Sequence, residues 1–253
     1  MHNRYVCDQA PLRVYWETTR ACDLACRHCR AEAEPQASPD ELTTDEGKAL
    51  LDAVAAFGEP LPHLVFTGGD PLKRKDLWEL LAHAKERGIH FSVAPSATPL
   101  LTPEPIVRLK NAGTEAISLS IVGATAESHD GIRAVAGTFQ TTLAAAREAV
   151  AVGLPFQVNT LVAEETVDEL AAIHALVRAI GAARWSLFFL ISVGRGQALQ
   201  SISAQRAEEL MGWLCTLRAQ GGLVLPILQN RRSLDRPESS AAATASMGSL
   251  GGV

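Results

Sequence analysis

The sequence predicts an α/β fold, a partial (β/α)6 TIM-like barrel with a disordered C-terminal tail. Short apolar runs alternate with amphipathic stretches six times before about residue 221, and such repeated strand–helix units favour a parallel sheet with outer helices. The units end at six, whereas a closed barrel of eight units typically needs about 250 residues or more. A doubly wound open sheet is the alternative, and the pattern alone does not separate the two.

The elements follow one another in order along the chain. The predicted strands are short, continuous apolar runs at residues 12–19, 63–66, 89–97, 116–121, 155–162 and 184–192. The predicted helices are amphipathic stretches at residues 43–57, 76–88, 102–113, 139–153, 166–181 and 203–222. A longer connection, residues 124–137, follows the fourth strand.

Capping signals set the ends of several helices. Thr44 is the expected N-cap of the first helix, with Gly47 as an unfavourable residue soon after it. Gly88 and Gly113 are expected to close the second and third helices, because glycine readily adopts the left-handed conformation found there.

Composition limits the class of protein. The net charge is −5, charged residues make up 20% of the chain and no basic face stands out, so nucleic acid is not an expected partner. The N-terminus lacks the apolar segment of a signal peptide. No apolar run reaches the roughly 18–20 residues that cross a bilayer. We therefore predict a cytoplasmic protein that does not enter the membrane.

The chain divides into a core and a tail. Residues 10–221 are predicted to form the core domain, which a hydrophobic content of 47% can supply. Residues 222–253 are rich in serine, alanine and glycine and lack periodicity, which predicts a disordered or truncated tail.

Three of the five cysteines lie within eight residues, at Cys22, Cys26 and Cys29. A cytoplasmic cysteine group of this kind is more often a metal or redox site than a disulfide. Structural zinc needs four ligands, and His28 is poorly placed as the fourth because it adjoins Cys29. A 4Fe–4S cluster is normally held by four cysteines. With three, one iron keeps an open position, as catalytic metal sites do.

These residues carry a resemblance to a known family. The stretch "CDLACRHC" has the CxxxCxxC form of the radical S-adenosylmethionine superfamily and follows the first strand, as in that family. The stretch "TGGDP" (residues 67–71) after the second strand resembles the GGE motif of the family. "SLSIVGATAESHDGIRAVAGTF" resembles the fourth-strand region of the subgroup that modifies peptides and tetrapyrrole cofactors. The resemblance covers about residues 12–217.

The resemblance implies a cofactor pair and a reaction class. Cys22, Cys26 and Cys29 would hold a 4Fe–4S cluster whose open iron chelates S-adenosyl-L-methionine. Reductive cleavage would give a 5′-deoxyadenosyl radical that abstracts hydrogen from a peptide or a tetrapyrrole-like precursor. A flavodoxin or ferredoxin would supply the electron. The alternatives are a non-catalytic zinc module and an electron-carrier iron–sulfur protein.

The resemblance also assigns cofactor-binding residues, and each has a plainer interpretation. Gly68 and Gly69 would contact the methionine ammonium, with Asp70 adding negative charge, or the motif is a tight turn. Arg133 would pair with the methionine carboxylate, or it is a solvated loop arginine. Ser96 and Asn159 stand at strand ends that related enzymes use for the ribose and adenine, and their plainer interpretation is strand-end capping. The last predicted residue is Ser120, which lies on the same strand face as Ser118.

The match departs from the family at three places. Val122 stands where the family usually has Asp, and Asp70 replaces the commoner Glu. After the barrel the chain has only Cys215, whereas the subgroup often carries further cysteines there for auxiliary clusters.

"SVGRG" (residues 192–196) resembles a family loop near the adenine or is an ordinary loop. Of Tyr15 and Trp16, one is expected to fill the core, because neighbouring strand residues face opposite sides.

Overall fold

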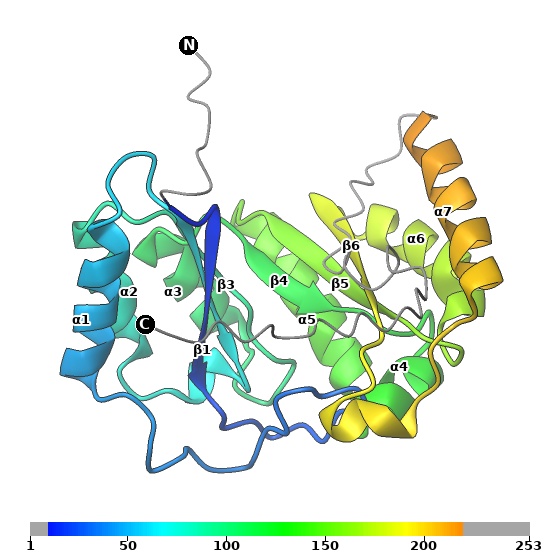
Figure 1. The fold of residues 1–253 in the computed structure, drawn as a ribbon, viewed down its shortest axis with the longest axis horizontal. Helices are drawn as coiled ribbons and strands as arrows, with labels where there is room; N and C mark the ends of the chain where they lie inside the picture. The colour runs from blue at the N-terminus through cyan, green and yellow to red at the C-terminus, as the bar shows by residue number, and fades with distance from the viewer. Residues whose placement is uncertain (1–9, 220–253) are drawn as a thin grey trace, which may run out of the picture.

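A computed structural model describes residues 10–219 as one six-stranded parallel sheet flanked by helices (Figure 1). The strands are β1 (Arg13–Thr19), β2 (His63–Gly68), β3 (Phe91–Val93), β4 (Ile117–Ser120), β5 (Phe156–Val162) and β6 (Arg184–Phe189). Their order in the sheet is the order of the sequence, β1 to β6. A doubly wound sheet reverses its strand order partway, so the sequential order confirms the partial TIM-like barrel. The predicted tail, residues 222–253, and Cys7 lie outside the described residues.

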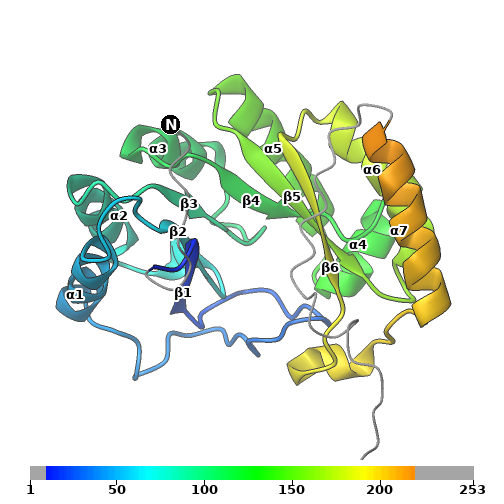
Figure 2. The ribbon, with the colours of Figure 1, turned by 45° about the horizontal axis from the view of Figure 1, so that its top comes forward.

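The helices cover one face of the curved sheet, as Figures 1 and 2 show. They are α1 (Thr44–Ala55), α2 (Leu77–Glu86), α3 (Pro103–Ala112), α4 (Ala126–Arg133), α5 (Thr138–Ala151), α6 (Leu170–Ala179) and α7 (Ala204–Ala219). Three short 3-10 helices complete the set: η1 (Pro71–Lys73), η2 (Val167–Glu169) and η3 (Gly194–Ala198). No helix within the described part of the chain is long and apolar enough to span a membrane.

The hydrophobic core lies between the sheet and the helices. Trp16, Phe66 and Phe91 come from three adjacent strands and form an aromatic row, with ring centroids 5.6 and 5.7 Å apart. Trp16 is buried and Tyr15 is 50% exposed on the opposite face of β1. The expectation that one of these two fills the core is therefore correct, and the side-chain alternation of a strand explains it.

The start of α1 differs from the sequence prediction by one residue. Thr43, and not Thr44, is the N-cap: its hydroxyl accepts from the backbone N–H of Glu46, and the Glu46 carboxylate accepts from the backbone N–H of Thr43. Gly47 is also required. A Cβ there would lie 2.9 Å from atoms of Trp16 and of Leu80, so the missing side chain lets α1 pack closely against β1 and α2.

The predicted connection 124–137 contains the helix α4, which the sequence prediction missed. Thr125 caps it through a reciprocal arrangement with Ser128. The helix has only eight residues and includes serine, aspartate and glycine, which have low helix propensity. Its tertiary packing therefore outweighs a weak local preference. The third strand is shorter than predicted, since only Phe91–Val93 pairs as a strand.

Candidate functional site

The carboxyl ends of the strands surround a cavity of about 290 Å³, which we call the cysteine cavity. Its lining includes nine of the ten residues that the sequence analysis assigned to the cluster or the cofactor, namely Cys22, Cys26, Cys29, Gly68, Gly69, Ser96, Ser120, Arg133 and Asn159. Asp70 is not on the cavity wall. The carboxyl ends of parallel strands meet at one edge of a sheet, so residues that are far apart in the sequence come together here.

The cysteines lie on the loop after β1, residues 20–43, which we call the cysteine loop. Backbone hydrogen bonds hold its first part closed, from Cys22 N to Glu34 O (2.7 Å) and from Glu34 N to Arg20 O (3.0 Å). Cys29 N donates to Cys26 O (3.1 Å), which makes a turn between the last two cysteines. In Figure 1 the loop crosses below the sheet from β1 toward η3.

The three thiols share one small hydrophobic environment. Cys22 and Cys26 are buried, Cys29 is half-buried, and none is in a disulfide. Burial raises the pKa of the Cys26 thiol, and the nearby Arg133 guanidinium acts against that rise. Within residues 10–219, no three His, Cys, Asp or Glu side chains are arranged around a single metal ion. An iron–sulfur cluster does not require such convergence, because its cysteines bind separate irons.

Gly68 and Gly69 allow the end of β2 to approach the cysteine loop. A Cβ on Gly69 would lie 2.4 Å from Ala21 O, and one on Gly68 would lie 2.4 Å from Thr19 O. Gly68 also has φ +128°, which L side chains rarely adopt. Backbone bonds join the two segments, from Gly69 N to Thr19 O and from Asp70 N to Ala21 O, each 2.7 Å. The turn after β2 therefore holds the first part of the cysteine loop close to the end of that strand.

Asp70 stabilises this turn without lining the cavity. Its side chain is fully buried and accepts hydrogen bonds from Thr98 Oγ1 (2.6 Å), Ser96 N (3.2 Å) and Leu72 N (3.2 Å). Burial raises its pKa, and these hydrogen bonds act in the opposite direction. The carboxylate thus ties the loop after β2 to the loop after β3. Ser96 completes the tie, because its hydroxyl donates to Gly69 O (2.7 Å).

Arg133 reaches the cavity from the C-terminal end of α4. It is 6% exposed, lines the cysteine cavity, and its buried Nε has no hydrogen-bond partner among the described residues. A buried guanidinium without a partner is costly, and a carboxylate supplied by a ligand would satisfy it. The interpretation as a solvated loop arginine is wrong, because the side chain is buried on a helix.

Arg195, on η3, is a residue that the sequence analysis missed. Its Nε donates to Cys26 O (3.0 Å), its Nη1 donates to Ala33 O (3.2 Å), and its backbone N–H donates to Cys29 O (3.2 Å). Gly194 beside it leaves room for this approach, since a Cβ there would lie 2.9 Å from Cys29 O. The signal was present in "SVGRG", where glycines flank a single arginine. This segment is therefore an anchored part of the site and not an ordinary loop.

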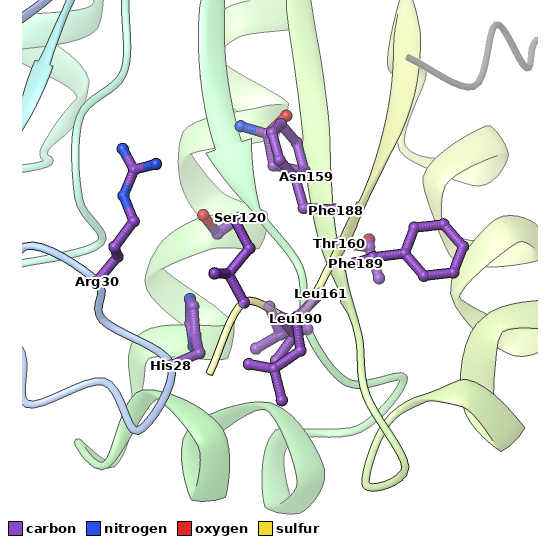
Figure 3. A pocket seen from close by; sticks show the side chains of 11 residues that line it. His28, Arg30, Ser120, Asn159, Thr160, Leu161, Phe188, Phe189 and Leu190 are labelled. Carbon is purple, nitrogen blue, oxygen red and sulfur yellow. The ribbon is translucent and has the colours of Figure 1, made fainter. Parts of the chain in front are cut away.

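A second cavity of about 320 Å³ adjoins the first and shares His28, Arg30, Ser120 and Asn159 with it. Figure 3 shows His28 and Arg30 of the cysteine loop on one side and the ends of β4, β5 and β6 on the other. Much of the far wall is apolar, from Val122, Leu161, Phe188, Leu190 and Ile191. Burial, with smaller effects from Arg133 and Arg195, lowers the pKa of His28 to about 3, so its imidazole is neutral.

The turn after β4 is ordered by a histidine. Val122 is buried, and its backbone N–H donates to Nδ1 of His129 (3.3 Å). His129 is fully buried, and burial is the main cause that lowers its pKa to about 3. The ring is therefore neutral and free to accept at Nδ1. The His129 imidazole on α4 thus holds the turn at Val122, the position at which the family that the sequence resembles usually has an aspartate.

Comparison with known proteins places these features in a family. The sequence profile described as the Radical SAM superfamily matches residues 16–177. The chain is 41% identical over 207 residues to the AdoMet-dependent heme synthase of Nitratidesulfovibrio vulgaris, covering 81% of this chain and 56% of that protein. It is 35% identical over 174 residues to the PqqA peptide cyclase of Rhodopseudomonas palustris, covering 69% and 45%. The chain spans about half the length of the curated relatives it matches.

Solved structures share the fold at low identity. Streptococcus suis SuiB bound to S-adenosylmethionine has a TM-score of 0.72 at 13% identity, covering 87% of this chain and 51% of SuiB. Native anSMEcpe with bound AdoMet has a TM-score of 0.68 at 15% identity, covering 85% and 62%. Identities this low establish a common fold.

Proposed function

Because the chain belongs to the radical SAM superfamily, we propose that it is an S-adenosylmethionine-dependent radical enzyme, with residues 10–221 as its core domain. Cys22, Cys26 and Cys29 are its cluster ligands. One observation carries the proposal: the three thiols line a single cavity together with the Gly68–Gly69 turn and the unpartnered guanidinium of Arg133. When bound, the reduced cluster and S-adenosylmethionine would together supply a 5′-deoxyadenosyl radical for hydrogen abstraction from the substrate.

The chain's own residues fit this cofactor pair. Three soft thiolate donors suit iron and leave a coordination position unfilled by the protein. Arg133 offers a fork of donors to the methionine carboxylate. Gly68 and Gly69 present backbone rather than side chains to the methionine ammonium. Asp70 acts as a positioning residue, because its oxygens already bind Thr98, Ser96 and Leu72.

Other residues hold the adenosine end and limit the access of water. Ser120 and Asn159 line both cavities and offer hydrogen bonds to ribose and adenine. Ser96 holds the Gly69 carbonyl and supports the adjoining wall. The apolar wall beside them excludes water from a reactive species. The substrate is a peptide or a tetrapyrrole-like precursor, and a flavodoxin or ferredoxin supplies the electron.

Anaerobic reconstitution tests the proposal. Protein reconstituted with iron and sulfide, then reduced in the presence of S-adenosylmethionine, should release 5′-deoxyadenosine, measured by liquid chromatography. Cys26→Ala should abolish this product. Cys215→Ala is the matched control and should retain it, because Cys215 is exposed on α7, away from the cavity.

Spectroscopy separates the alternatives. The electron paramagnetic resonance signal of the reduced cluster should change when S-adenosylmethionine is added. A signal that does not respond would identify an electron carrier. A colourless protein with one bound zinc would identify a metal-binding module. Either result would overturn the proposed function.

A further inference from the structure

The inner, concave face of the sheet encloses a cavity of about 860 Å³. Closed barrels of this type fill the same space with layers of bulky branched side chains. Here much of the lining is small or polar, and includes Ser92, Ser118, Gln157 and Ser186. The cavity also lies within the usual range of small-molecule sites, about 300–1,000 Å³. The lumen therefore has the size and lining of a binding chamber.

The chamber is continuous with the cysteine cavity. Six residues line both: Glu17, Arg30, Thr67, Ala94, Ser118 and Asn159. Glu17 and Thr67 lie toward the carboxyl ends of β1 and β2, and Arg30 lies on the cysteine loop. The remainder of the chamber extends toward the strand starts. A ligand in the chamber thus reaches from the cysteine cavity toward the opposite end of the sheet.

Two arginines lie at that opposite end. Arg13 begins β1 and Arg184 begins β6, the two edge strands, and both line the chamber. In Figure 1 the starts of β1 and β6 lie at the upper edge of the sheet, away from the cysteine loop. Among residues 10–219, neither guanidinium has a hydrogen-bond or ion-pair partner within reach. Burial lowers the pKa of His63 and both arginines add to that effect, which places the two cations near one histidine.

The neighbouring acidic group does not pair directly with these arginines. Glu115 is the carboxylate beside them, and it is engaged by His63 (3.5 Å to Nδ1) and by His90. Glu17, the other acidic residue of the chamber, pairs with Arg30 at 3.4 Å near the cysteine cavity. Two cations at the end of a chamber, with no carboxylate of residues 10–219 paired to either of them, suit a ligand that carries carboxylates.

We propose that Arg13 and Arg184 form a carboxylate-binding site for the substrate, at the end of the chamber far from the cofactor. The proposal rests on the proposed function, since it assigns the chamber to that enzyme's substrate. Tyr15 and Phe188 line the chamber between this site and the cysteine cavity, on the two edge strands. Their rings offer flat apolar surfaces. The ligand class is therefore a flat macrocycle with carboxylate side chains rather than an extended peptide.

Binding of coproporphyrin III, a fluorescent macrocycle whose side chains end in carboxylates, tests this site. The full-length protein with its reconstituted cluster and S-adenosylmethionine is titrated without reductant, so no turnover is needed. Arg13→Gln and Arg184→Gln should each weaken binding about tenfold, the effect of losing one charge-assisted hydrogen bond. Arg178→Gln is the control, because Arg178 is exposed on α6 outside the chamber, and it should leave binding unchanged.

Two further binding measurements test whether the arginines contact the carboxylates of the ligand. The methyl ester of the macrocycle should bind the wild-type protein more weakly than the free acid does. It should bind Arg13→Gln and the wild type with equal affinity. Arg13→Lys and Arg184→Lys should recover part of the affinity, since lysine keeps the charge without the fork. Circular dichroism confirms that each variant is folded before titration.

The outcomes separate this inference from the proposed function. Equal binding of acid and ester, or equal affinity in wild type and both glutamine variants, would overturn the carboxylate site even if the wild-type protein releases 5′-deoxyadenosine. Arginine-dependent binding of a glutamate-rich peptide, with no binding of the macrocycle, would overturn the ligand class. Arginine-dependent macrocycle binding in a protein that never cleaves S-adenosylmethionine would support the site and overturn the proposed function.

Discussion

At the scale of single residues, the cysteine cavity depends on a missing side chain at Gly69 and on the Asp70 side chain, which does not line it. Gly69 is required because a Cβ would collide with Ala21 O at 2.4 Å. Asp70 lies behind the same turn and gathers three donors from two loops. The positions of the cavity-lining backbone groups are therefore set by close backbone packing at Gly69 and by hydrogen bonds to Asp70 behind it.

The first prediction at this scale concerns the pH dependence of stability. Because burial raises the Asp70 pKa in the folded protein, the stability that Asp70 contributes is fully present below about pH 4, its ordinary pKa. That stability is lost as the pH rises through the raised value. The free energy of unfolding of the wild type, relative to Asp70→Asn, should therefore fall as the pH rises above about 4, by about 1.4 kcal/mol for each tenfold change in proton affinity.

Urea unfolding at a series of pH values measures this difference. Asparagine keeps an acceptor for Ser96 and Leu72, so Asp70→Asn should stay folded. Asp70→Ala leaves three buried donors unsatisfied and should cost about 3 kcal/mol or more. A wild-type advantage that grows with pH would mean that Asp70 is stabilised as the anion, contrary to the burial argument.

At the scale of elements, two segments distant in sequence hold the cysteine loop in place. α4 contributes a backbone bond from Arg27 N to Ile132 O (2.9 Å). η3, after the last strand, contributes Arg195 and its contacts with Cys26 and Ala33. The cysteine loop is thus anchored on both sides by elements that follow β4 and β6.

Arg195→Ala should loosen the cysteine loop. It removes two hydrogen bonds of about 1 kcal/mol each, so the buried thiols of Cys22 and Cys26 should react with Ellman's reagent about tenfold or more faster in cluster-free protein. Arg147→Ala, on the exposed face of α5, is the control and should not change the rate. Unchanged reactivity in Arg195→Ala would show that η3 does not anchor the loop.

At the scale of the whole molecule, the open barrel brings both edges of the sheet to one site. β1 and β6 are not hydrogen-bonded neighbours, yet the loops that follow them meet through Arg195 and Cys29. The walls of the two adjoining cavities come from β1, β2, β4, β5 and β6 and the segments that follow the strands. A ligand that fills these cavities therefore links parts of the barrel that the sheet leaves separate.

We expect S-adenosylmethionine to stabilise the cluster-loaded protein as a whole. At a concentration 100 times its Kd, a ligand that binds only the folded state adds about 2.7 kcal/mol. For a domain of this size that corresponds to a rise in Tm of about 5–10 °C. Anaerobic thermal unfolding with and without the ligand measures the shift, and Cys26→Ala should show a smaller one. An identical Tm under both conditions would contradict a cofactor site at the strand ends.

The sequence by itself determined the order and type of most elements, because strand and helix periodicities are local properties. It also determined which residues converge at the strand ends, since parallel strands bring their carboxyl ends to one edge whatever the details. Only the tertiary structure decided between a barrel and a doubly wound sheet, because strand order depends on packing between distant segments. The roles of Arg195, His129 and Asp70 were hidden for the same reason: each acts through a contact with a loop far away in the sequence or with buried backbone, and no local pattern encodes such a contact.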